Sequence, residues 1–269
     1  MELLERRGGS DTVSTVLDSI VAGVLEDVKS REIPLAELRA QLDLAPQVRD
    51  AYGALAAPGM QIIAEVKRSS PSKGVLAPIG DPAALAHSYE LAGAAVISVL
   101  TEGRRFLGTP GDLIAVRSRV AIPVLRKDFI VTEYQVIESR VLGADLMLLI
   151  VAALTDNQLR DYQALAHELG MSVLVEVHDV EELQRALEMK ARIIGVNSRN
   201  LKTLEINEAA FSELLPLIPS DLVKVAESGI ATREQVIAAE LLGAKAILVG
   251  ESLVRAGDRA LAIKNLLGR

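Results

Sequence analysis

The 269-residue sequence has no cysteine and only three histidines. The missing cysteines exclude disulfide bonds, thiolate metal sites and cysteine nucleophiles. His87, His167 and His178 are too few and too scattered along the chain for a metal cluster. The nucleotide-binding patterns GxGxxG and Walker A are also absent. We therefore expect no metal site and no cofactor.

Long apolar runs and blocks of basic residues are missing too. No apolar run approaches the roughly 18 residues that span a bilayer, and the N-terminal MELLERRGGSD lacks the basic-then-apolar pattern of a signal peptide. The net charge is -7, without a lysine or arginine cluster that would bind nucleic acid. We expect a cytoplasmic protein with no nucleic-acid or membrane partner, acting as a monomer, with weak self-association as the alternative.

What the sequence has is apolar residues, 50% of the chain, which is enough for a large core. Eight short runs rich in β-branched residues predict strands. They cover residues 62–66, 94–100, 122–125, 145–151, 172–178, 192–197, 222–226 and 246–250. Amphipathic stretches between them predict helices, four of which end near a glycine suited to a left-handed C-cap. These glycines are Gly93, Gly143, Gly170 and Gly243.

This alternation predicts an α/β protein, a (β/α)8 TIM barrel over residues 61–269. A doubly wound open sheet is the alternative, although it usually has fewer strands and often a glycine-rich first turn. Residues 1–60 are predicted to form an N-terminal helical extension of the same structural domain. Apolar residues at helical spacing predict a helix over 12–30 that packs against the barrel, and Pro34 opens a second, short helix.

Charged residues gather at the predicted carboxyl ends of strands, where barrels of this kind carry their active sites. Strand alternation places Glu65 and Lys67 on the inward face, and the same test places Glu176 inward. Three further strand ends add Lys127, Asn197 and Glu227. One such residue alone is usually a solvated rim residue. Six residues from five strand ends are hard to dismiss, because desolvating unpaired charges is costly, so we predict acid–base chemistry there.

The last two strand–helix loops predict an anion site. ESGI follows the seventh strand and VGES follows the eighth, so Gly229 and Gly250 leave backbone N–H groups accessible. Loops at these two places form the usual phosphate site of this fold. Ser228 and Ser252 could add hydroxyl donors. We therefore predict a small phosphorylated ligand.

Seven motifs together resemble the indole-3-glycerol-phosphate synthase family of tryptophan biosynthesis. They are IIAEVKRSSPSKG, TEGRRFLG, VLRKDFIV, LVEVH, IGVNSRNL, VAESGI and LVGES. The resemblance runs from about residue 12 to the C-terminus and includes extra helices before the barrel. It implies ring closure of 1-(2-carboxyphenylamino)-1-deoxyribulose 5-phosphate, with loss of carbon dioxide and water, to indole-3-glycerol phosphate.

The resemblance also implies roles for the strand-end residues. Lys127 matches the general acid of ring closure, Glu176 the base, and Lys67 a second lysine that contacts the substrate or serves as the dehydration acid. Glu65 would hold and tune these groups. Asn197 and Glu227 would position the hydroxyls and the lysines. Which lysine serves which step stays open.

Other positions would bind the substrate. Those at family substrate or phosphate positions are Ser70, Arg199, Leu248, Ser228, Gly229, Gly250 and Glu251. Glu251 could act only through its backbone, because its carboxylate would repel a phosphate. Phe106 and Phe129 follow strands and could pack on the anthranilate ring, or simply pack their loops. The stretch RSSPSKG after the first strand is predicted to be a mobile lid.

Two alternatives to this function remain at the level of the sequence. The glycine-containing endings after the last two strands also occur in related phosphate-binding barrels, such as phosphoribosylanthranilate isomerase. A non-catalytic barrel that binds a phosphorylated metabolite would need those loops but not the lysines and glutamates. The acid–base residues count against that second alternative.

Overall fold

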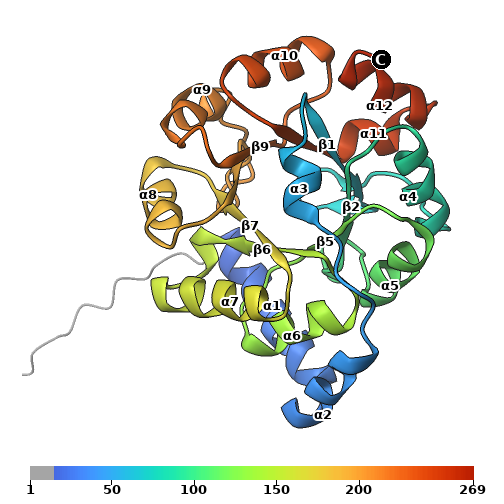
Figure 1. The fold of residues 1–269 in the computed structure, drawn as a ribbon, viewed down its shortest axis with the longest axis vertical. Coiled ribbons are helices and arrows are strands. Elements are labelled where there is room, and N and C mark those ends of the chain that lie inside the picture. The colour runs from blue at the N-terminus through green and yellow to red at the C-terminus, as the bar shows by residue number, and fades with distance from the viewer. Residues whose placement is uncertain (1–14) are drawn as a thin grey trace, which may run out of the picture.

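The computed structural model describes residues 15–269, and a barrel of eight strands lies at its centre (Figure 1). The strands are β1 (Gln61–Val66), β4 (Val96–Leu100), β5 (Val124–Lys127), β6 (Leu146–Ile150), β7 (Ser172–Val177), β8 (Ile193–Asn197), β9 (Val223–Glu227) and β10 (Ala246–Val249). They pair in parallel and close in the order β1-β10-β9-β8-β7-β6-β5-β4. The predicted TIM barrel is confirmed, with every strand within two residues of its expected bounds.

Helices surround this barrel, as the ring of coiled ribbons in Figure 1 shows. They are α4 (Pro82–Leu91), α5 (Pro110–Arg119), α6 (Glu133–Val141), η2 (Val151–Ala153), α7 (Asp156–Glu168), α8 (Val180–Glu188), α9 (Ala210–Leu214), η3 (Leu215–Leu217), α10 (Arg233–Leu241), α11 (Glu251–Arg255) and α12 (Arg259–Leu267). Side-chain oxygens of threonine and aspartate cap several of them at the N-terminus, as their sequences suggested. The four C-cap glycines all have positive φ, between 83° and 102°.

The N-terminal extension consists of α1 (Val16–Arg31), α2 (Leu35–Ala40), η1 (Gln41–Leu44) and α3 (Ala51–Ala56). The helix predicted over 12–30 is found as α1, and residues 12–14 lie outside the described part. Pro34 precedes α2, as predicted. The sequence analysis missed α3, which contacts β1, β4 and β9.

Ion pairs fasten α1 to loops and helices at the carboxyl ends of the strands. Arg31 makes a two-pronged contact with Glu138 of α6, with nitrogen–oxygen distances of 2.9 and 3.0 Å. Arg104, in the loop after β4, donates to Asp27 at 2.7 Å. The side chain of Ile20 lines the pocket that opens there. The extension therefore contributes to the wall of the barrel mouth.

The segment predicted as a lid contains a small hairpin that the sequence analysis did not foresee. β2 (Ser69–Ser70) pairs antiparallel with β3 (Gly74–Val75). Ser69 and Ser70 are buried, whereas Gly74 and Val75 are exposed. Its mobility stays a prediction.

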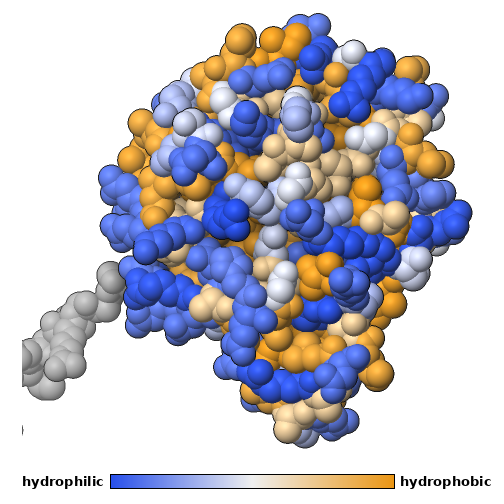
Figure 2. Space-filling model, in the orientation of Figure 1, coloured by the Kyte–Doolittle hydropathy of each residue, from blue (hydrophilic) through white to orange (hydrophobic). Residues whose placement is uncertain are grey.

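The outer surface in the view of Figure 2 is mixed, with hydrophilic residues over much of it and hydrophobic ones in separate patches. Large exposed apolar side chains, such as Leu91 of α4 and Leu241 of α10, lie on the outside of the helical ring. Among the described helices none is both long and apolar enough to cross a membrane.

Replacing Gly143, which follows α6, should destabilise the fold more than replacing Gly93, which follows α4, because only Gly143 is crowded. A Cβ at Gly143 would lie 3.0 Å from carbons of Arg117 and Pro46, while at Gly93 the nearest atoms would be 3.7 Å away. Both have positive φ, so Gly93→Ala should lower the free energy of unfolding by about 1 kcal/mol. Gly143→Ala should lower the free energy of unfolding by roughly 1 to 3 kcal/mol more than Gly93→Ala does, because the added methyl group overpacks the site.

Urea unfolding of both variants measures this difference. Equal losses in the two variants would mean that the crowding at Gly143 is relieved without cost.

Candidate active site

The carboxyl ends of the strands open into one cavity of about 330 Å³. Ser252 lines it, as do all fifteen residues that the sequence analysis proposed for catalysis or for substrate and phosphate binding. They are Glu65, Lys67, Ser70, Phe106, Lys127, Phe129, Glu176, Asn197, Arg199, Glu227, Ser228, Gly229, Leu248, Gly250 and Glu251. The structure thus brings them together, and their individual roles remain predictions.

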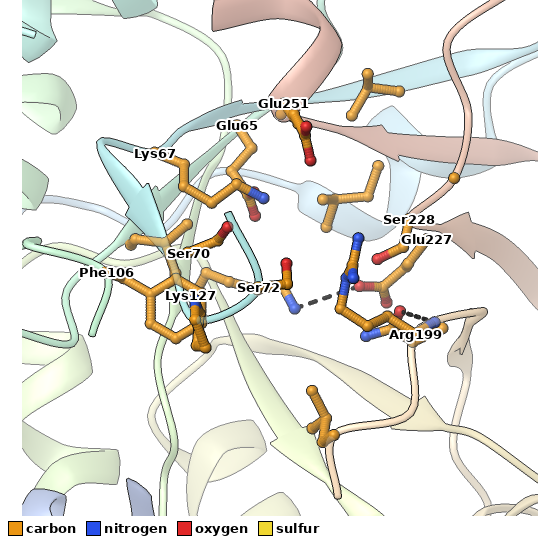
Figure 3. A pocket seen from close by; sticks show the side chains of 18 of the residues that line it. Glu65, Lys67, Ser70, Ser72, Phe106, Lys127, Arg199, Glu227, Ser228 and Glu251 are labelled. Atoms are coloured by element: carbon orange, nitrogen blue, oxygen red, sulfur yellow. Dashed lines mark hydrogen bonds and ion pairs between the residues drawn. The ribbon is translucent and has the colours of Figure 1, made fainter. Parts of the chain in front are cut away.

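A lysine between two carboxylates forms the floor of the cavity. Lys127 Nζ lies 2.7 Å from Glu176 Oε2 and 3.3 Å from Glu227 Oε2. Both glutamates are 1% exposed at the side chain, whereas the lysine is 13% exposed. The ammonium group is therefore the most accessible of the three groups, while the two carboxyl groups beside it are almost fully buried. Figure 3 shows Lys127 and Glu227 among the side chains around this space.

Burial and charge act against each other in this cluster. Burial disfavours the charged form of Lys127, but the carboxylates of Glu176 and Glu227 outweigh it and hold the pKa of the ammonium well above its usual range. Burial of Glu176 is likewise outweighed, chiefly by Lys127, so the pKa of that carboxyl is lowered. Burial, which Lys127 only partly offsets and to which Glu176 adds, raises the pKa of Glu227 to about 8.

The two inward residues of the first strand form a second pair. Lys67 Nζ lies 2.7 Å from Glu65 Oε1, and the other carboxylate oxygen of Glu65 accepts from Ser98 at 3.4 Å. Glu65 is 2% exposed. Gly250 leaves room for it, because a Cβ there would lie 2.5 Å from Glu65 Oε1. At the end of β1, a buried Glu65 is thus paired with a partly buried Lys67, and both line the cavity.

Glycine also makes room for Glu227. The Cβ of any other residue at Gly195 of β8 would overlap Glu227 Oε1. Register explains this contact, since Gly195 pairs with Val225, two residues before Glu227 on the same strand. Neither oxygen of Glu227 has a hydrogen-bond partner within residues 15–269. This carboxyl is therefore held by shape and by charge.

Asn197 links the floor of the cavity to the loop after β8. Its Nδ2 donates to Glu176 Oε1 at 3.0 Å, and its Oδ1 accepts the backbone N–H of Arg199 at 3.0 Å. The guanidinium of Arg199 donates to the carbonyl of Leu204 at 2.9 Å. The amide thus orients the carboxylate and the start of the loop together.

Apolar side chains form the other side of the cavity. The rings of Phe106 and Phe129 are 6.1 Å apart and inclined by 40°. Glu102, 3% exposed, shapes the loop that carries Phe106, because its carboxylate accepts the backbone N–H groups of residues 104, 105 and 106. Leu248 of β10 also lines the cavity. A flat aromatic group would fit against this side.

The loops after β9 and β10 border the cavity with backbone. Ser228 and Gly229 have φ of 66° and 74°, so two successive residues are left-handed. Within the described residues, no hydrogen bond is found for the N–H of Gly229. Gly250 precedes α11, and the side chain of Glu251 pairs with Arg255 at 3.4 Å. Free N–H groups here suit an anion.

Some residues at the site were not singled out from the sequence. Ile20, Ser72 and Arg255 line the cavity, and all three come from loops or helices whose position depends on tertiary packing. Arg126 lies within β5 and faces outward, 0% exposed. His178 contacts Glu176, and strand alternation, which puts residues 176 and 178 on one face, could have revealed it.

No group of three or more histidine, aspartate or glutamate side chains that could hold a metal ion occurs in residues 15–269. The charged groups of the cavity are instead paired with one another. The arrangement can donate and accept protons beside an apolar wall and an anion-binding rim.

Comparison with known proteins agrees with this geometry. The family model described as Indole-3-glycerol phosphate synthase matches residues 17–266. A relative of that name from Nocardioides sp. is 55% identical over 94% of this chain and 98% of its own length. Another, from Mycolicibacterium gilvum, is 52% identical over 94% of both chains.

Among solved structures, an N-acetylmannosamine-6-phosphate 2-epimerase from Clostridium perfringens has a TM-score of 0.60, covering 78% of this chain and 94% of that one. At 13% identity this likeness concerns the fold alone. The family model and the relatives cover nearly the whole chain. The chain therefore belongs to the indole-3-glycerol phosphate synthase family.

Proposed function

We propose that the cavity at the barrel mouth converts 1-(2-carboxyphenylamino)-1-deoxyribulose 5-phosphate into indole-3-glycerol phosphate, carbon dioxide and water. The chain is an enzyme of tryptophan biosynthesis, a carboxy-lyase, as its family membership indicates. The observation that carries the mechanism is the buried Lys127 cation, paired with two glutamates and open to the cavity.

Lys127 is the proposed acid of ring closure. The ring carbon that bears the carboxylate attacks the ketone carbon, and the Lys127 ammonium gives its proton to the ketone oxygen. Loss of carbon dioxide then restores the aromatic ring. The position supports this role, because a proton donor must reach the oxygen on which negative charge develops.

Dehydration needs a second acid and a base. Lys67 is the proposed acid, giving a proton to the departing hydroxyl so that it leaves as water. Glu176 is the proposed base for the proton on the adjacent carbon, whose loss completes the indole. Glu65 holds Lys67 at 2.7 Å, and Asn197 holds Glu176 at 3.0 Å. Glu227 would position Lys127 and the substrate hydroxyls.

Substrate binding divides between the two sides of the cavity. The phosphate is proposed to take the N–H groups of Gly229, Gly250 and Glu251, with the hydroxyl of Ser228. Ser70 and Arg199 would contact the rest of the sugar chain. Phe106, Phe129 and Leu248 would hold the anthranilate ring.

This reaction balances with acid–base groups alone, and we predict that it needs no metal or cofactor. A monomeric state and a cytoplasmic location are also predictions. Activity that survives exhaustive dialysis against a chelator would support the first of these.

Neutralising the proposed acid or base should abolish turnover while leaving the fold intact. We expect Lys127→Met and Glu176→Gln each to lower kcat by at least about 10²-fold, because one proton transfer is lost. Formation of the fluorescent product measures this, and circular dichroism checks the fold.

Lys245→Met is the matched control, since Lys245 is exposed beside the amino end of β10 and does not line the cavity. Near-normal turnover in either cavity variant would remove that residue from the mechanism.

Glu227 should reduce stability at alkaline pH. Its folded pKa of about 8 lies above the ordinary 4.5, so the stability that it contributes is present at acid pH and is lost as pH rises from 4.5 towards 8. Glu227→Gln removes this ionisation. We expect the variant to be more stable than the parent at pH 8, by on the order of 1 kcal/mol, with a smaller difference at pH 5.

Turnover should fall in the same variant at pH 8 and above, where the parent has an ionised Glu227 beside Lys127 and the variant has a neutral amide. Urea unfolding at both pH values tests the stability claim. A variant less stable than the parent at pH 8 would contradict the raised pKa.

A further inference from the structure

His178 extends the charged floor on the side away from the cavity. It follows β7 directly, and its Nε2 lies 3.3 Å from Glu176 Oε1. Its side chain is 8% exposed, and it does not line the cavity. The ring therefore contacts the proposed base without being open to the substrate.

Glu182, in the first turn of α8, holds the ring from the other side. Its Oε2 lies 2.9 Å from His178 Nδ1 and also accepts the backbone N–H of the histidine at 2.8 Å. The side chain of Glu182 is 10% exposed. One carboxylate oxygen thus sets both the rotamer of the ring and the end of the strand.

Both ring nitrogens of His178 consequently face carboxylates. Nδ1 bonds to Glu182, whereas Nε2 has no hydrogen-bond partner within residues 15–269 and makes only the 3.3 Å charge contact with Glu176. Two carboxylates this close favour the ring with two protons, an imidazolium. The electrostatics agree, because burial opposes the charge but Glu176 and Glu182 outweigh it and raise the pKa of His178 to about 10.

Glu176 lies between two cations as a result. Its Oε2 pairs with Lys127 at 2.7 Å, whereas its Oε1 faces His178 and accepts from Asn197. When Lys127 gives its proton to the substrate, one of the two positive charges disappears. Without the other, Glu176 would itself attract a proton before the step in which it is needed as a base.

We propose that His178, oriented by Glu182, is a positioning residue that holds the Glu176 carboxylate in place and keeps it ionised after Lys127 has given up its proton. This inference rests on the roles proposed above for Lys127 and Glu176. The groups that face the imidazolium are Glu176 from β7 and Glu182 from α8, and Lys127 from β5 and Glu227 from β9 act on it through Glu176.

The charge of the ring can be measured without activity. Protein carrying ¹⁵N-labelled histidine gives separate ring signals, and His178→Gln assigns those of residue 178. We expect His178 to carry protons on both nitrogens at pH 8, with a bond to Glu182. A neutral ring at pH 8 would overturn the proposal, whether or not the proposed reaction is found.

Kinetics test the effect on the base. His178→Gln should lower kcat about tenfold or more while KM changes little, because the substrate does not touch the ring. The acid limb of the kcat profile should move to higher pH by about one unit, since loss of the neighbouring positive charge raises the pKa of Glu176.

Glu182→Gln provides an independent variant. The amide oxygen can still accept from Nδ1, but the negative charge is gone, so the ring should lose its proton at lower pH than in the parent. We expect near-parental kcat at pH 6 and a decline as pH rises through the lowered pKa of His178. His87→Gln removes another histidine–glutamate pair, at 3.0 Å from Glu90 and away from the cavity, and should leave the profile unchanged.

A purely structural role would change the urea midpoint without moving either limb of the pH profile. That result in both His178→Gln and Glu182→Gln would refute the proposal. If the parent makes no indole-3-glycerol phosphate, the proposed function fails, and the NMR measurement still decides the charge of the ring.

Discussion

The buried cation of Lys127 is the constraint around which the barrel mouth is organised. A lysine so enclosed is tolerated only with counter-charges at short range, because desolvation of an unpaired ammonium costs several kcal/mol. Glu176 and Glu227 supply them from two other strands, so the chemistry depends on the register of the sheet. Gly195 follows from the same constraint, because only a residue without a side chain leaves space for the second carboxylate.

Alternation along β5 ties this cation to the outer layer. Arg126, the residue before Lys127, points away from the barrel and bonds to Asp128 and Glu138 at 3.1 and 2.8 Å. Glu138 in turn holds Arg31 of α1. The strand that presents the proposed acid is thus held from behind by a buried ionic network that includes the N-terminal extension. A change in α1 should therefore alter the position of Lys127, although no charged residue of α1 lines the cavity.

Much of this architecture could be predicted from short-range patterns. Strand periodicity and helix caps, which depend on local sequence, predicted the barrel. The rule that active sites lie at the carboxyl ends of the strands then predicted the cavity residues. The missed elements are too short to show a clear hydrophobic period. α3 is a six-residue helix that packs on three strands, and the hairpin of β2 and β3 has two residues in each strand.

His178 shows where such reasoning stops short of mechanism. The alternation of side chains along β7 predicts that His178 lies on the same face as Glu176. The charge of His178 cannot be predicted in this way, because it depends on the contact with Glu182 of α8. Two carboxylates and one ring make the histidine a cation, whereas the same ring in solvent would be a neutral group at pH 8. A catalytic site that moves protons in sequence needs some charges that stay constant while others change. In the mechanism proposed for this barrel, the mobile proton belongs to Lys127, which is open to the cavity, and the constant charge belongs to His178 behind the proposed base.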